Sequence, residues 1–157
     1  MGKHSACTPI LPEAFTIARM RPGTPDPDLR CPCGSGDTYG ACCGRFHSGL
    51  AQGVSAPTAE ALMRSRYSAY ALGDTTYLLA TWHPSTRPAT LELDTSTRWR
   101  RLDVVRTTAG GPFDTEGTVD FEARFVDEGG RGVLREHSRF VREEGRWYYV
   151  DGDAAGA

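Results

Sequence analysis

The sequence has no long hydrophobic run and no apolar core for a secretory signal. Its longest apolar stretch, near residues 77–82, is far shorter than the ~18 consecutive apolar residues that cross a bilayer. Pro9, Pro12 and Glu13 interrupt the segment in which a signal peptide would need its apolar core. We therefore expect a cytoplasmic protein with no membrane partner.

The chain also lacks an excess of charge of one sign. Its 18 Lys and Arg residues and 20 Asp and Glu residues give a formal net charge of −2, which does not predict a general polyanion-binding surface. A chain of 157 residues with 39% hydrophobic residues can bury a core, which excludes disorder throughout. It fits a small module attached to a domain of about 100 residues. We expect residues 1–29 to be a flexible N-terminal segment, with Cys7 as a surface thiol and Met20 as an alternative start.

Cysteine is absent after residue 43, and four of the five cysteines lie within thirteen residues. A Cys-Pro-Cys pair is followed by eight residues and then by two adjacent cysteines. A segment this short cannot bury enough apolar surface to offset its chain entropy, so a metal or a disulfide has to hold it. Zn²⁺ takes four thiolates in a tetrahedron, and two close pairs on a glycine-rich reversing loop can supply them. The spacing predicts one zinc ion held by Cys31, Cys33, Cys42 and Cys43.

Disulfides are the alternative to the metal. A reducing compartment disfavours them, and the adjacent Cys42 and Cys43 would be strained partners. His47 could replace one cysteine as a ligand, or be a histidine that packs nearby. Four protein ligands leave no open position for an activated water, so we expect a structural metal that does not make the protein an enzyme.

The metal-binding segment combines a CPCGSG run at residues 31–36 with Tyr39, the adjacent Cys42 and Cys43, and then His47. This order resembles the SEC-C motif, a small zinc module named after the C-terminal tail of the translocase ATPase SecA. The resemblance covers residues 31–50. It implies zinc binding by the four cysteines and a docking role, with a protein or ribosomal partner for the module.

Beyond residue 50 the pattern changes to that of an α+β domain. Helix formers fill residues 58–72, and Gly73 stops them before Asp74 caps a second helix that Pro84 ends. We expect a short strand over residues 90–93 and a helical turn over residues 95–101. Alternating apolar residues then predict antiparallel strands with turns at residues 129–130 and 143–145. Helices followed by such a meander predict an α+β layer, with the first helices packed on one face of a curved antiparallel sheet.

Three segments of this domain carry a second resemblance: residues 60–70 (EALMRSRYSAY), 82–88 (WHPSTRP) and 145–152 (GRWYYVDG). From about residue 30 to residue 153 the chain resembles the YchJ-like family of uncharacterised bacterial proteins. The resemblance implies a SEC-C module at residues 31–50 and a cone-shaped nuclear-transport-factor-2-like (NTF2-like) domain at residues 56–153. That fold hosts isomerases, dehydratases and binding modules alike, so it does not specify a reaction.

Two opposite charges inside the cone form a candidate ligand site. Helical spacing places Arg66 on an apolar stripe, and strand alternation turns Glu136 to the interior. A buried charge seldom stays unpaired, so we expect the two to meet directly or across one water. We favour an ion pair that ties helix to sheet, with His137 on the outer face. The alternative is that the two charges line a pocket in which His83 or His137 carries a proton. The pocket candidates are Arg66, Tyr67, Tyr70, Trp82, Glu136 and Phe140.

Trp99 lies in a basic cluster with Arg98, Arg100 and Arg101, which could contact a nucleic acid. As a helix the segment would instead turn Trp99 and Leu102 inward and leave the arginines in solvent, and we favour this interpretation. The sequence therefore predicts a cytoplasmic zinc-binding adaptor protein. The alternative is a small-molecule-binding protein or enzyme that uses the cavity of the cone, which bulky side chains would fill in an adaptor.

Overall fold

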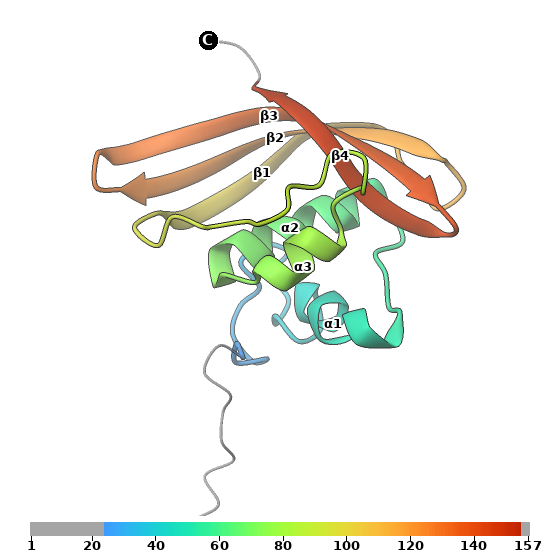
Figure 1. The fold of residues 1–157 in the computed structure, drawn as a ribbon. Coiled ribbons are helices and arrows are strands. Elements are labelled where there is room, and N and C mark those ends of the chain that lie inside the picture. The colour runs from blue at the N-terminus through green and yellow to red at the C-terminus, as the bar shows by residue number, and fades with distance from the viewer. Residues whose placement is uncertain (1–23, 155–157) are drawn as a thin grey trace, which may run out of the picture.

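The structure, a computed structural model, describes residues 24–154 as helices packed under one antiparallel sheet (Figure 1). Most of the expected N-terminal segment, with Cys7 and Met20, lies outside these residues. No helix in the described range is long and apolar enough to cross a membrane. The elements are α1 (Cys43–Ser48), the 3₁₀ helix η1 (Leu50–Gln52), α2 (Ala59–Leu72), α3 (Thr75–Ala80), β1 (Arg98–Ala109), β2 (Glu116–Asp127), β3 (Gly130–Glu143) and β4 (Arg146–Ala154).

Side-chain caps begin both helices of the main domain. The Thr58 hydroxyl accepts a hydrogen bond from a backbone N–H in the first turn of α2, and the Asp74 carboxylate does the same for α3. The predicted pair of closely joined helices is confirmed. The second helix ends at Ala80, before the predicted end at Pro84, because the chain leaves α3 to form a bridge with β4.

Two local predictions between the helices and the sheet are wrong. Residues 90–93 form no strand, and residues 95–101 are not helical, since a turn leads directly into β1 at Arg98. The Asp94 carboxylate accepts hydrogen bonds from the backbone N–H and the hydroxyl of Ser96, which stabilises this turn. The spacing of Trp99 and Leu102 is that of a helix, but the segment pairs with β2 as a strand. A local sequence pattern cannot reveal this pairing.

The four strands form a simple meander in the order β1-β2-β3-β4, with every neighbouring pair antiparallel. The turns at residues 128–129 and 144–145 lie where the sequence predicts them. The alternating positions Val119, Phe121 and Ala123 of β2 are buried. These observations confirm an α+β fold with helices on one face of a curved antiparallel sheet.

Bulges give the sheet its curvature. The register of β1 against β2 shifts between Trp99 and Arg101 and again between Val104 and Arg106, and each extra residue bends a strand and increases its twist. The first bulge lets Trp99 and Leu102 face the helices together although they are three positions apart. Figure 1 shows the sheet arched over α2 and α3.

The core continues through α2 into the cysteine segment. Buried residues of the sheet, such as Val119, belong to the same cluster as Leu62 of α2 and as Tyr39 and Phe46 of the cysteine segment. In Figure 1, α2 and α3 lie between the sheet and α1. The cysteine module is therefore packed on the domain and does not stand apart from it.

Candidate metal centre and cavity

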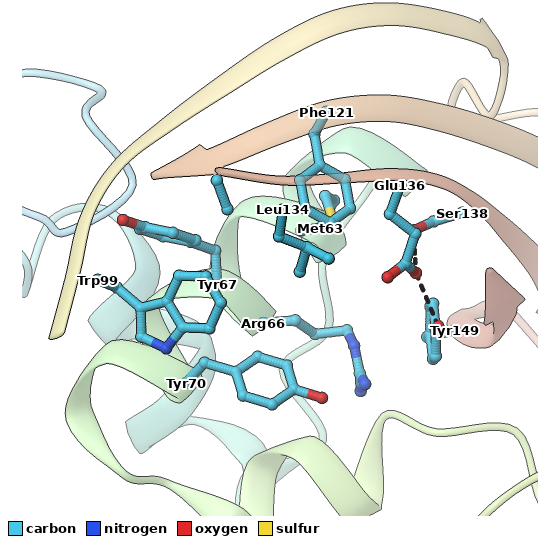
Figure 2. Close-up of a pocket in the computed structure, with 11 residues that line it drawn as sticks. Met63, Arg66, Tyr67, Tyr70, Trp99, Phe121, Leu134, Glu136, Ser138 and Tyr149 are labelled. Atoms are coloured by element: carbon cyan, nitrogen blue, oxygen red, sulfur yellow. Dashed lines mark hydrogen bonds between the residues drawn. The ribbon is translucent and has the colours of Figure 1, made fainter. Parts of the chain in front are cut away.

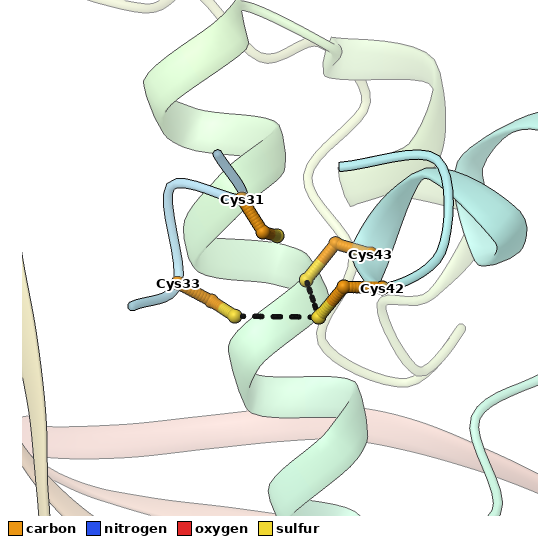
Figure 3. A group of neighbouring side chains, drawn as sticks. All are labelled: Cys31, Cys33, Cys42 and Cys43. Carbon is orange, nitrogen blue, oxygen red and sulfur yellow. Dashed lines mark hydrogen bonds between the residues drawn. The ribbon is translucent and has the colours of Figure 1, made fainter. Parts of the chain in front are cut away.

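The four cysteines selected by their spacing lie together. Their Sγ atoms all lie within 4.8 Å of one another, with 3.6 Å between Cys33 and Cys42 and 3.9 Å between Cys42 and Cys43 (Figure 3). A tetrahedral ion with a metal–sulfur distance near 2.3 Å has sulfur–sulfur edges of ~3.8 Å. A disulfide bond would need about 2.05 Å. The sulfur spacing therefore fits four ligands around one ion.

Local backbone structure brings the two cysteine pairs together. The N–H of Cys31 donates to the carbonyl of Asp37, and a bridge joins Arg30 to Thr38, so the loop between the pairs folds back on itself. Within this reversal Gly36 has a φ of +91°, which a residue with a side chain adopts only with strain. The second pair lies at the start of α1. Residues 27–29 of the expected flexible segment take part, since Pro27 and Leu29 accept hydrogen bonds from residues 40 and 39.

Polar groups from the module and from α2 surround the sulfurs. The Ser35 hydroxyl donates to Cys42 Sγ at 3.2 Å, and Ser68 Oγ of α2 lies 3.6 Å from Cys31 Sγ. Such contacts orient metal ligands and offset their charge. Burial raises the pKa of the Cys42 thiol, so a cation is needed to keep the cluster fully ionised at neutral pH.

His47 is not part of the sulfur cluster. Its Nε2 lies 2.7 Å from the carbonyl oxygen of Ser65 in α2, and its Nδ1 lies 2.5 Å from the Tyr39 hydroxyl. Because a carbonyl only accepts, Nε2 carries the proton and Nδ1 accepts from Tyr39. Burial lowers the pKa of His47, which keeps this neutral form. The option that His47 replaces a cysteine ligand is wrong in this geometry, and the ring fastens the module to α2.

A cavity of about 190 Å³ lies between α2 and the sheet (Figure 2). Of the pocket candidates, Arg66, Tyr67, Tyr70 and Glu136 line it, whereas Trp82 and Phe140 do not. Phe140 is a buried core residue, and Trp82 lies at the guanidinium of Arg66. Seven further lining residues were not predicted as pocket residues: Met63, Trp99, Phe121, Ala123, Leu134, Ser138 and Tyr149.

Arg66 is a buried cation with no carboxylate partner among the residues that the structure describes. Its side chain is 2% exposed, and Nη1 donates to the carbonyl of Leu78 and to Thr81 Oγ1, each at 2.8 Å. The guanidinium lies 4.5 Å from the ring centre of Tyr149 and 5.1 Å from that of Trp82, a cation–π arrangement. Burial lowers the pKa of Arg66.

Glu136 faces the same cavity but does not contact Arg66. Its Oε1 accepts hydrogen bonds from the Tyr149 hydroxyl at 2.9 Å and from Ser138 at 2.8 Å. Gly152 pairs with Ser138 on β3, and a Cβ atom there would lie 1.9 Å from this oxygen, so only glycine fits beside the Glu136 carboxylate in this arrangement. No ion pair joins Arg66 to a carboxylate in residues 24–154. The predicted direct contact is wrong, because each charge has found neutral partners around Tyr149.

Neither candidate proton carrier reaches the cavity. His83 bonds to Glu143 at 2.9 Å and to Ser85 at 2.6 Å near the surface. His137 pairs with Asp120 on the outer face of the sheet, as the ion-pair interpretation expects. The cavity therefore has no histidine among the residues that line it.

The basic cluster around Trp99 lies on β1 and not on a helix. Arg98, Arg100 and Arg101 are exposed, while the Trp99 ring packs edge-on against Phe125 at 5.5 Å and lines the cavity. An aromatic ring turned inward cannot stack on a base, so the cluster lacks the platform that single-stranded nucleic acid needs.

Comparisons with known proteins agree with this architecture. Residues 58–152 match the family model described as YchJ, middle NTF2-like domain, and residues 30–45 match the SEC-C motif. A UPF0225 protein of Streptomyces coelicolor is 54% identical over 127 residues, which cover 81% of this chain and 97% of that protein.

Two solved structures are also similar. A SEC-C motif containing protein from Rhodopseudomonas palustris has a TM-score of 0.67 at 38% identity, covering 80% of this chain and 98% of that one. A second one, from Psychrobacter arcticus, has a TM-score of 0.67 at 29% identity, covering 83% of this chain and 86% of that one.

Proposed function

The chain belongs to the YchJ-like UPF0225 family, and from its two sites we propose that it is a zinc-containing binding protein of the cytoplasm whose ligand occupies the cavity under the sheet. The observation that supports the metal is the sulfur geometry of the SEC-C segment. The observation that supports ligand binding is the cavity that bulky side chains leave open.

Zinc is the ion that best suits the donor set. Four thiolates at tetrahedral spacing are typical of structural zinc, and the reducing cytoplasm keeps such thiols free to bind it. Cys31, Cys33, Cys42 and Cys43 would hold the ion, which would cross-link the two halves of the module and leave no open position for a substrate. Ser68 and Arg64 of α2 contact the module at Cys31 Sγ and at the carbonyl of Cys33, so the metal site also anchors the module to the domain.

Ligand binding now ranks above the adaptor role that the sequence favours. The cone is not filled, since about 190 Å³ remains open beside Arg66, and an apolar cavity of about 150 Å³ already takes up benzene. The Arg66–Glu136 ion pair that would make the interior purely structural is not formed. The adaptor role, with a protein or ribosomal partner for the module, stays a prediction.

Metal analysis of the purified chain tests the zinc centre. We expect one zinc per chain in the wild type and in the matched control Cys7→Ser, and well below one in Cys43→Ser. A chain prepared under reducing conditions that contains no metal, and two disulfides by mass spectrometry, would contradict the proposal.

A neutral probe tests the cavity. Added to the zinc-loaded chain, 3-methylbutanol should shift the NMR signals of the Trp99 indole and the Leu134 methyl groups in a saturable way. The substitution Ala123→Leu, which adds bulk to a residue that lines the cavity, should abolish the effect. If no small compound of this size binds, the ligand-binding function is wrong.

A further inference from the structure

Two opposite charges line one small cavity without touching each other. Arg66 and Glu136 both line it, yet no nitrogen of Arg66 lies within the 4.0 Å that defines an ion pair with a carboxylate oxygen. Burying a charge is costly, and a buried charge normally closes the gap to an opposite charge in the same cavity. Arg66 is buried and Glu136 is half-buried. Tyr149 contacts both groups, since its ring lies 4.5 Å from the guanidinium and its hydroxyl donates to Glu136. The three residues therefore form a polar end of the cavity.

Arg66 keeps hydrogen-bond donors available at this polar end. Among its contacts in the described part of the chain, both hydrogen bonds come from Nη1. The Tyr70 hydroxyl lies close to the guanidinium (Figure 2) and is the one other protein group near Nε and Nη2 among the residues that line the cavity. With the side chain 98% buried, as its 2% exposure implies, these two nitrogens have little access to bulk water. The Nε–Nη2 edge of a guanidinium matches the two oxygens of a carboxylate.

Glu136 offers the complementary group. Both hydrogen bonds that it accepts in the described residues end on Oε1, which leaves Oε2 for another donor. An ammonium group suits it best, because a charged donor forms the stronger bond to a carboxylate.

The rest of the cavity is apolar. Figure 2 shows Met63, Leu134 and Phe121 beside the polar end formed by Arg66, Glu136 and Tyr149. Leu134 is 36% exposed although it lines the cavity, so the apolar side reaches the solvent there. A ligand that fits has two opposite charges close together and a short apolar tail.

We propose that the cavity binds a small apolar zwitterion of the α-amino acid type. Its carboxylate bonds to Arg66, its ammonium group bonds to Glu136, and its aliphatic side chain packs against Met63, Phe121 and Leu134. This inference rests on the proposed ligand-binding function and adds the chemical class of the ligand.

Three probes with the same branched tail separate the two charges. Leucine has both, 4-methylpentanoate lacks the ammonium group, and 3-methylbutylamine lacks the carboxylate. By NMR titration of the zinc-loaded full chain, we expect leucine to bind at least about tenfold more tightly than either of the other two. Equal affinities of the three would overturn the inference, while binding of neutral 3-methylbutanol would still support the ligand-binding function. If none of the four compounds binds, both the inference of a zwitterionic ligand and the proposed ligand-binding function are wrong.

Two variants assign each charge to its partner. Arg66→Met should make leucine bind no better than 3-methylbutylamine, and Glu136→Gln should make it bind no better than 4-methylpentanoate. The outer-face variant Arg135→Met should leave all three affinities unchanged. Arg66→Met removes buried contacts, so its fold is checked by zinc content and circular dichroism. If Arg66→Met does not fold, Glu136→Gln provides an independent test. A preference for leucine that survives Glu136→Gln would overturn the inference.

Discussion

Replacement of Arg66 by methionine tests how the buried cation is held. Methionine is of similar length but loses the donors to Leu78 and Thr81 and the stacking on Trp82 and Tyr149. The hydrogen bonds contribute about 3 kcal/mol together and the two ring contacts about 2 kcal/mol. Relief of the buried charge returns about 2 kcal/mol. We expect Arg66→Met to lower the free energy of unfolding by about 3 kcal/mol.

Combining this substitution with Glu136→Gln distinguishes the structure from a direct ion pair. A glutamine keeps an oxygen for Tyr149 and Ser138, so Glu136→Gln alone should cost about 1 kcal/mol or less. Since Arg66 is held by other groups, the double variant should be within about 1 kcal/mol of Arg66→Met. A direct pair would instead let the double variant recover much of the ~3–5 kcal/mol that breaking a buried pair costs.

Urea denaturation of the zinc-loaded proteins measures these differences, provided that the slope of free energy against urea is unchanged. The matched control is Arg135→Met, whose exposed pair with Glu122 should contribute at most about 1 kcal/mol. A double variant more stable than Arg66→Met by over about 2 kcal/mol would refute the reasoning.

Two further predictions concern His47 and Gly152. Burial holds the pKa of His47 below its ordinary 6.5, so the unfolded chain takes up a proton first as pH falls. The stabilisation that neutral His47 gives the folded chain is complete above about pH 6.5 and is lost as the pH falls below it. Between pH 7.5 and 5.5 the unfolding free energy of His47→Gln should therefore fall less than that of the wild type. Equal pH dependence of the two unfolding free energies would contradict this prediction. Gly152→Ala should lower the unfolding free energy by about 1–3 kcal/mol because its Cβ displaces the Glu136 carboxylate. In thermal melts, Gly152→Ala should destabilise the Glu136→Ala variant much less than the wild type. An equal loss of stability in both backgrounds would contradict the contact.

The cysteine cluster and the order of elements could be predicted because their signals are local. Close spacing selects Cys31, Cys33, Cys42 and Cys43, and caps at Thr58 and Asp74 define the helix starts. Strand alternation likewise places Glu136 inside and His137 outside.

The cavity could be predicted only in part, because its shape depends on long-range pairing. The sequence correctly predicts that Trp99 and Leu102 face inward, but on a helical turn, since the bulge that turns both inward on a strand exists only against β2. Ser138 and Tyr149 share the inward parity of Glu136 and Trp147, a signal that could have found them. Tyr149 contacts both Arg66 and Glu136, and the two charges do not contact each other. This depends on distances that no sequence periodicity can predict.

The helix α2 packs against the module on one side and lines the cavity on the other. A chain whose module is unfolded would therefore expose one side of α2. One side carries the buried Ser65 and Ser68, whose carbonyl and hydroxyl respectively contact the module. The other side carries Arg66 and Met63 at the cavity. Removal of the module would leave the carbonyl of Ser65 without its hydrogen bond from His47 and would expose to solvent the side of α2 that the module buries. Proteases and chaperones act on surfaces of this kind. We therefore expect a chain that has lost its metal to expose this surface of α2 and to be cleaved faster by an added protease than the metal-loaded chain.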